Sequence, residues 1–284
     1  MANTAYASQA ASLALLVVAS SGVTAQELGL PSGTDEKARW ALALTGGVWS
    51  GKWQENLSGS SRHVYERATL PVVALELNRY TANDNVKFRL NSSYGKSIYD
   101  GWTSTGQAIM STSDLDMLGA QVEYQWKLSP DLAWGFRAEH ELFSRQINRV
   151  AAIKGYLEEY TRSSLLVGGT KIIQFSGGAS LNLAAWYGGG EGHKMRLKLD
   201  PYEPATVRLG STRKMDVSAT WQAPLDRTDQ PKWDFIGQLA FNRSETGQSE
   251  VGDLKNQGRS VGTFIQPSTE SSGWQLTIGI ACTW

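Results

Sequence analysis

Two short motifs in this sequence combine residue types that could activate a water molecule. Asp114 and Asp116 form a D-x-D pair within STSDLDML, and Glu191 and His193 form an E-x-H pair within GGGEGHKM. A carboxylate two residues from a histidine can orient the ring and raise its basicity, and two aspartates across a cleft can position and activate a water. Brought together, these four side chains would form a hydrolytic site.

Each motif also has a simpler interpretation. Asp114 and Asp116 fit a solvated rim, and His193 fits an exposed loop histidine. The sequence has no metal-ligand cluster, no phosphate-binding glycine motif and no G-x-S-x-G elbow, so we expect no cofactor and no bound metal. Cys282 is the only cysteine, which excludes an intramolecular disulfide, and 27 basic against 27 acidic residues argue against a nucleic-acid partner.

Most of the 284 residues follow a two-residue hydrophobic alternation, which is the pattern of half-buried strands. In AQVEYQWK, for example, Val122, Tyr124 and Trp126 share one face, and the intervening residues are polar. The alternating runs predict about ten strands, within a range of 8–12, near residues 38–54, 62–79, 85–97, 113–128, 132–148, 156–174, 179–195, 208–222, 233–245 and 263–284.

The strand pattern also predicts where the four motif residues point. Leu115 and Met117 are apolar and are expected to face outward, which would aim Asp114 and Asp116 inward. Because Val122 requires the opposite parity, a bulge is expected near residues 118–119. Strict alternation aims His193 outward, unless the glycines at 188–190 reset the register.

An export signal is expected at the start of the chain. The apolar run ASLALLVVA (11–19) is too short to span a bilayer as a helix, and Val23 and Ala25 satisfy the small-residue rule for cleavage after Ala25. No Lys or Arg precedes this run, so the basic region typical of such signals is missing. The alternative is an N-terminal core helix. We therefore predict a signal peptide at 1–25 and one barrel domain at 26–284.

Three features indicate that the apolar strand faces contact lipid. The opposite faces carry charge along much of their length, tryptophans sit at the ends of strands joined by short turns, and short turns alternate with longer loops. Strands are compatible with lipid only in a closed barrel that leaves no unpaired edge. The sequence therefore predicts an all-β, closed antiparallel transmembrane barrel. Its inward charges are expected to form salt bridges in a mostly filled lumen: Glu76, Lys87, Arg89, Glu123, Arg137, Glu139, Glu141, Asp216 and Asp234.

The last eight residues, TIGIACTW, resemble the C-terminal recognition signal of bacterial outer-membrane proteins. The matching positions are Thr277, Gly279 and the terminal Trp284, whereas Cys282 replaces the usual larger hydrophobic residue. This resemblance implies a multi-pass protein of the bacterial outer membrane. It also implies contact with lipopolysaccharide and other lipid, an insertion machinery that reads the final strand, and periplasmic chaperones.

The two motifs, together with GWTSTG (101–106), also resemble the omptin family of ten-stranded outer-membrane proteases that cut next to basic residues. The resemblance implies that Asp114 and Asp116 match the family's Asp pair, and that Glu191 and His193 match its Asp-x-His. Glu191 replaces an Asp, and the outer loops are shorter than in the family. Our first expectation is a non-enzymatic envelope or surface-interaction protein. The alternatives are an omptin-like protease, a narrow pore, and a lipid-A-modifying enzyme that leaves no motif.

Overall fold

The computed structural model describes residues 38–284 except 57–61, 103–107, 152 and 226–231. The expected signal peptide at 1–25 lies outside the described residues, as does the first part of the predicted barrel domain. The described chain forms long antiparallel strands that hydrogen-bond in sequence order. In this part of the chain, no helix is long and apolar enough to cross a membrane.

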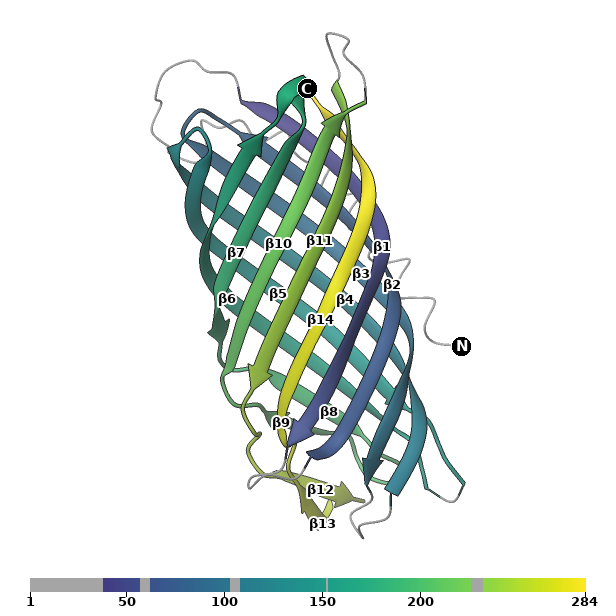
Figure 1. Cartoon of the computed structure of the whole chain (residues 1–284). Helices are drawn as coiled ribbons and strands as arrows, with labels where there is room; N and C mark the ends of the chain where they lie inside the picture. Colours follow the sequence, from purple (N-terminus) through teal and green to yellow (C-terminus); the bar gives the residue numbers. More distant parts are fainter. Residues whose placement is uncertain (1–37, 57–61, 103–107, 152, 226–231) are drawn as a thin grey trace. The chain divides into compact units, whose positions relative to one another are not determined.

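The strands close into an antiparallel barrel (Figure 1), as the alternation predicts. β14 pairs with both β1 and β11, and β5 pairs with β6, so the sheet has no open edge around its circumference. The barrel wall has ten strand positions, here called staves. β7 and β8 together form the seventh stave, and β9 and β10 together form the eighth. The bounds are β1 Arg39–Asn56, β2 Arg62–Tyr80, β3 Asp84–Trp102, β4 Ala108–Ser129, β5 Leu132–Ile147, β6 Tyr156–Gln174, β7 Ser180–Gly190, β8 Lys194–Lys198, β9 Ala205–Arg208, β10 Thr212–Pro224, β11 Lys232–Thr246 and β14 Ser268–Thr283.

The two ends of the barrel differ in their connections. At one end, here called the turn end, β2 joins β3 and β4 joins β5 by short turns, and Trp40 and Trp284 exchange backbone hydrogen bonds of 3.1 and 3.0 Å. At the opposite loop end, the connection from β11 to β14 carries a two-stranded hairpin of β12 (Gly252–Asn256) and β13 (Arg259–Phe264). In Figure 1 the turn end is at the top and this hairpin is at the bottom.

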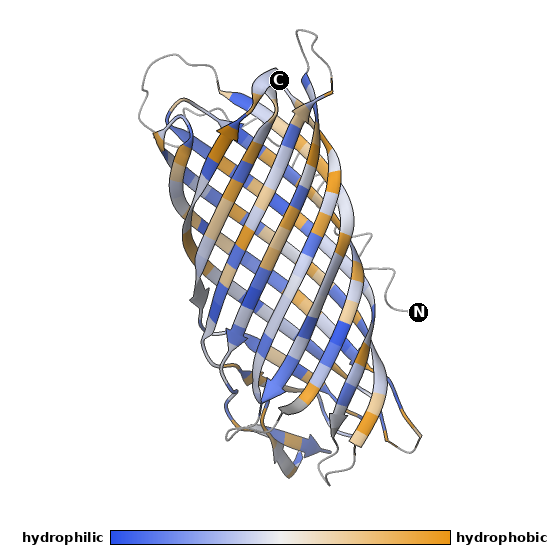
Figure 2. Cartoon of the chain, viewed as in Figure 1, coloured by the Kyte–Doolittle hydropathy of each residue, from blue (hydrophilic) through white to orange (hydrophobic). Residues whose placement is uncertain are grey.

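The outer wall carries an apolar band that begins at the turn end. Figure 2 shows orange and blue residues alternating along the strands, as expected for side chains that point alternately out and in. Trp126 and Trp134 lie on paired strands with ring centroids 5.2 Å apart, and both are more than one-third exposed. On β4 the band runs from Trp126 to Leu118, beyond which Asp116 faces outward. These nine residues correspond to roughly 20–25 Å at the usual strand tilt, which is close to the height of the apolar belt of a transmembrane barrel.

The final strand has the expected alternation. Leu276, Ile278 and Ile280 are 54%, 60% and 45% exposed on the outer wall, whereas Thr277 is 1% exposed and faces the lumen. At Gly279 an added Cβ would lie 2.0 Å from the Leu44 carbonyl oxygen on β1, so no larger residue fits without moving the strands. The role of Thr277, Gly279 and Trp284 in insertion stays a prediction.

Candidate functional site

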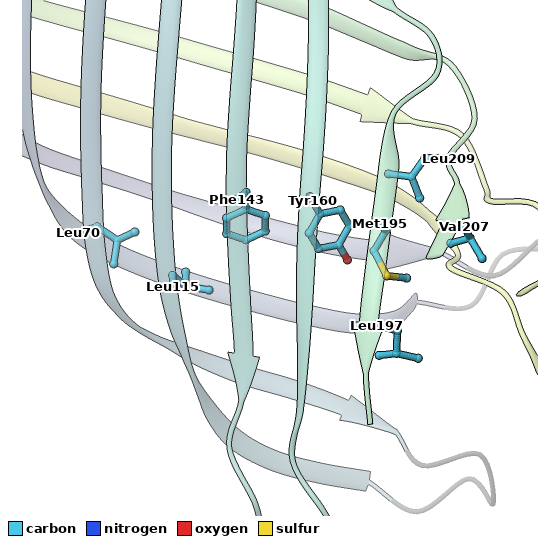
Figure 3. Close-up of a cluster of buried hydrophobic side chains, with 8 residues drawn as sticks. All are labelled: Leu70, Leu115, Phe143, Tyr160, Met195, Leu197, Val207 and Leu209. Atoms are coloured by element: carbon cyan, nitrogen blue, oxygen red, sulfur yellow. The ribbon is translucent and has the colours of Figure 1, made fainter. Parts of the chain in front are cut away.

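Toward the loop end, the interior of the barrel is filled mainly by apolar side chains. The buried side chains of this cluster come from β2, β4, β5, β6, β8 and β9 and the residue just after β9. Figure 3 shows them in a band across these strands: Leu70, Leu115, Phe143, Tyr160, Met195, Leu197, Val207 and Leu209. On the loop-end side of the apolar band the outer wall carries exposed charged residues such as Lys52, Arg67 and Lys96, as a wall in contact with water would. Apolar side chains in this part of the barrel are therefore stabilised inside, as in a soluble protein.

This change of polarity corrects the expected orientation of the Asp pair. Leu115 is 8% exposed and belongs to the inner cluster, so Asp114 and Asp116 point outward. The expected bulge is also absent, because β4 pairs continuously with β3 from Trp126 to Ala108. The prediction was wrong because it assigned every apolar residue to the lipid side. Asp114 lies 3.7 Å from the Lys96 ammonium on the outer wall.

The seventh stave contains a bulge that turns His193 inward. On β6, Thr161 and Leu165 are four positions apart. Their partners on the seventh stave, Lys194 and Gly189, are five positions apart. The extra residue reverses the parity of the strand, so His193 faces the lumen although strict alternation would aim it outward. Gly192, with a φ of 71°, supplies the left-handed conformation that this bulge needs. The reset lies just beyond the three glycines expected to provide it.

His193 is 1% exposed, and its ring is held by the backbone of β6. The Ser163 N–H donates a 3.2 Å hydrogen bond to Nδ1, while Nε2 has no partner within the described part of the chain. Burial lowers the pKa of His193, and the nearby Arg162 guanidinium lowers it further. A neutral imidazole that is sealed from water is poorly placed to act as a general base on an external substrate.

The structure does not bring the four motif residues together. Glu191 is exposed, whereas His193 is buried on the inner side of the barrel wall and Asp114 and Asp116 lie on its outer face. The Glu191 carboxylate has no hydrogen bond or ion pair with the described residues, so it does not orient the imidazole. The catalytic role of these residues stays a prediction, and their placement does not support it.

Sequence reasoning missed a buried charge cluster next to the apolar one. Arg145 is fully buried and contacts three carboxylates: Glu55 at 2.5 Å, Glu66 at 3.1 Å and Glu158 at 2.5 Å. Tyr160 donates a 2.8 Å hydrogen bond to Glu158. The four charged residues come from β1, β2, β5 and β6, so the cluster ties together staves from opposite sides of the β3–β4 pair. No local sequence motif could reveal it, because Arg145 is 90 residues from Glu55 in the sequence.

Arg162 lies beside this cluster and is enclosed by aromatic rings. Its guanidinium carbon is 4.9 Å from the centroid of Trp53 and 5.1 Å from that of Tyr160, which are cation–π distances. Its Nη1 lies 3.6 Å from Glu141, which faces the lumen as expected. Packing of this kind holds a cation inside the barrel against aromatic faces.

Between the turn end and the middle of the barrel, the lumen is filled by the expected salt-bridge network. Arg137 lies 2.9 Å from Glu123 and 3.3 Å from Asp216, and Lys214 contacts Glu139. Lys87 lies 3.7 Å from Glu123 and 3.9 Å from Glu76, and Arg89 lies 3.7 Å from Glu76. Cavities of about 130 and 160 Å³ remain between these side chains, and a third of about 100 Å³ lies nearer the loop end, beside Leu115, Phe143 and Arg162. The network therefore neutralises the inward charges within a largely filled interior.

Comparison with known proteins places the chain by fold alone. No protein-family model and no curated sequence matches it. Among solved structures, it is similar to the outer membrane protease OmpT from Escherichia coli, with a TM-score of 0.60 and 13% identity over 90% of this chain and 99% of that one. It is also similar, at TM-scores of 0.41 and 0.36, to the translocator domain of the autotransporter NalP from Neisseria meningitidis and to OprG from Pseudomonas aeruginosa. The match to the NalP domain has 11% identity over 99% of this chain and 99% of that one. The match to OprG has 10% identity over 88% of this chain and 97% of that one. The likeness to OmpT, together with the closed ten-stranded barrel, shows that the chain has the fold of a bacterial outer-membrane β-barrel.

Proposed function

We propose that the protein is a non-enzymatic barrel of the bacterial outer membrane that does not conduct solutes and presents its loop end at the cell surface. The observation that carries this proposal is the double closure of the lumen, first by the salt-bridge network and then by the apolar cluster around Leu70, Phe143 and Tyr160. A hydrated path would have to pass both. The apolar band on the outer wall supports the membrane location.

The arrangement of the motif residues favours this function over an omptin-like protease. Proteolysis of that kind needs a base and an acidic pair on one cleft, whereas here His193 is enclosed and Asp114 and Asp116 are on the outer wall. The exposed hairpin of β12 and β13 is the feature most available for contact with a partner. All six residues from Arg259 to Phe264 are at least partly exposed, and Val261 is 54% exposed.

The closed lumen is tested by electrical recording and by an activity assay. The full mature chain, folded into planar bilayers, should give no conductance steps, and a dibasic fluorogenic peptide should stay uncleaved while an omptin cleaves it in parallel. Folding is checked by a shift in gel migration between unheated and boiled samples. Reproducible conductance steps or peptide turnover that is lost in His193→Ala would overturn the proposal.

Orientation is tested by cysteine labelling in intact cells. In a Cys282→Ser background, Arg259→Cys on the β13 strand should react with a membrane-impermeant maleimide. Pro130→Cys, exposed in the β4–β5 turn, should react only after the outer membrane is permeabilised. The reverse pattern would show that the loop end faces the periplasm.

A further inference from the structure

Three exposed cations lie side by side on the outer wall of β1, β2 and β3. Lys52 and Arg67 are directly opposite each other in the β1–β2 ladder. Arg67 is opposite Ile98 on β3, and Lys96 is two residues from Ile98 on the same face, with its side chain 74% exposed. These residues form what we call the β1–β3 basic patch.

The charges of this patch are only partly neutralised. Like charges directly opposite in a sheet destabilise it. Neither Lys52 nor Arg67 has an acidic partner in the part of the chain that the structure describes, and Lys96 has Asp114 at 3.7 Å. Arg243 provides a contrast, because it lies on the outer wall of β11 with Glu245 at 2.8 Å and Glu270 at 3.0 Å. The patch therefore favours an external anion, whereas Arg243 is satisfied within the protein.

The patch lies at the edge of the apolar band. Lys52 is two residues beyond Ser50, which is opposite Trp274, and Trp274 and Tyr94 are 55% and 69% exposed. Aromatic residues at the end of an apolar belt mark the membrane interface. Two residues of a tilted strand rise roughly 5 Å, so the cations stand just outside the hydrocarbon, at the level of lipid headgroups.

Two hydroxyl groups complete the patch. Ser50 and Thr69 share a 3.1 Å hydrogen bond on the exposed face between Lys52, Arg67 and the apolar band. Phosphate oxygens accept hydrogen bonds from hydroxyl, ammonium and guanidinium groups. The flat guanidinium can donate hydrogen bonds to two phosphate oxygens at once. On the turn-end side of these hydroxyls, Val48 and Leu276 are 46% and 54% exposed and would contact the acyl chains of a lipid.

We propose that Lys52, Arg67 and Lys96, with the hydroxyls of Ser50 and Thr69, bind the phosphate groups of a phosphorylated lipid in the outer leaflet. The acyl chains of this lipid lie against the apolar band while its phosphates bridge the three cations. This inference rests on the proposed function for the side of the membrane that the patch occupies. It does not depend on whether the lumen conducts.

The test is a titration of the full mature protein, folded in detergent, with fluorescent bisphosphorylated lipid A. The triple variant Lys52→Gln, Arg67→Gln, Lys96→Gln should raise the Kd on the order of 100-fold, since each cation near an anionic headgroup contributes about one tenfold step or slightly less. Fully dephosphorylated lipid A should bind wild type and variant equally weakly. Inorganic phosphate at millimolar concentration should not displace the lipid; complete displacement would identify free phosphate as the occupant and overturn the proposal.

A second triple variant serves as the matched control. Lys194→Gln, Arg196→Gln, Lys198→Gln removes the same charge from three outward residues of β8, of which Arg196 and Lys198 are 3.7 and 2.7 Å from Glu159. Its Kd should change less than threefold. Equal weakening by both triple variants would show general charge attraction and overturn the patch. Gel migration before and after boiling confirms that each variant is folded. The cysteine-labelling experiment separately reports the orientation, so failure of one proposal is distinguishable from failure of the other.

Discussion

Between the turn end and the middle of the barrel, the lumen is filled by ion pairs, whereas toward the loop end it is filled by apolar side chains around Arg145 and Arg162. The outer wall changes in the opposite sense, from the apolar band to exposed residues such as Lys52 and Asp114. Where lipid covers the wall, polar side chains can only turn inward; where water covers it, most large apolar side chains are stabilised inside, although Ile98 and Met110 remain exposed. The same strands therefore bury polar side chains near the turn end and apolar side chains near the loop end.

The largest effect should come from Arg145. Replacing it with Met leaves Glu55, Glu66 and Glu158 buried together without a cation, and we expect a loss of about 3–5 kcal/mol in the free energy of unfolding. Urea unfolding of the protein in lipid vesicles measures this loss.

Arg137→Met is the matched change in the turn-end network. Its side chain is 12% exposed, and Glu123 and Asp216 keep Lys87 and Lys214 as partners at 3.7 and 3.8 Å. We therefore expect a clearly smaller loss than at Arg145. Equal losses would show that the two halves of the lumen do not differ in how they hold charge.

The apolar cluster should give the next largest effect. Leu70 is 0% exposed, so Leu70→Ala removes buried contacts and leaves a cavity, at a cost of about 2–5 kcal/mol. Leu276→Ala makes the same chemical change on the outer wall, where the side chain is 54% exposed, and it should cost much less. The same vesicle unfolding experiment compares the two, and a similar cost for both would argue against a packed loop-end core.

A smaller effect is expected at the bulge. Gly192 has a φ of 71° and no atom within 4 Å of an added Cβ, so Gly192→Ala should cost about 1–2 kcal/mol through backbone strain alone. Gly262→Ala is the control, since that position is equally open and has no left-handed backbone. If the two variants unfold at the same urea concentration, the bulge does not depend on this glycine.

The smallest effect concerns pH. Burial lowers the pKa of His193 in the folded protein, so the unfolded chain binds the proton more tightly. Stability should therefore fall as the pH decreases through about 6.5. His193→Gln should make the urea midpoint less dependent on pH between 7 and 5. An unchanged slope in His193→Gln would mean that the imidazole titrates normally.

The alternation along the chain was sufficient to predict the closed barrel and the inward ion pairs. A two-residue period assigns side chains to two faces, and it does so correctly for Val122 and Trp126 against Glu123, or for Leu276 against Thr277. The pairing of Arg137 with Glu123 and Asp216 could be anticipated in kind, because charges inside a narrow barrel need partners.

The faces near the loop end could not be assigned in this way. Leu115 and Asp116 alternate just as Val122 and Glu123 do, yet Leu115 points inward because lipid no longer covers the wall at its level. Period alone does not say which solvent a face meets. The same ambiguity led sequence reasoning to place Asp114 and Asp116 in the lumen and to require a bulge that β4 does not have.

The sequence by itself determined that the chain forms long strands with one apolar face, because that follows from residue order alone. Only the tertiary structure decided where the wall leaves the apolar band, that Gly192 turns His193 inward, and that Arg145 meets three carboxylates. These features depend on the height of each residue in the barrel and on contacts between distant strands. A local sequence pattern specifies neither of them.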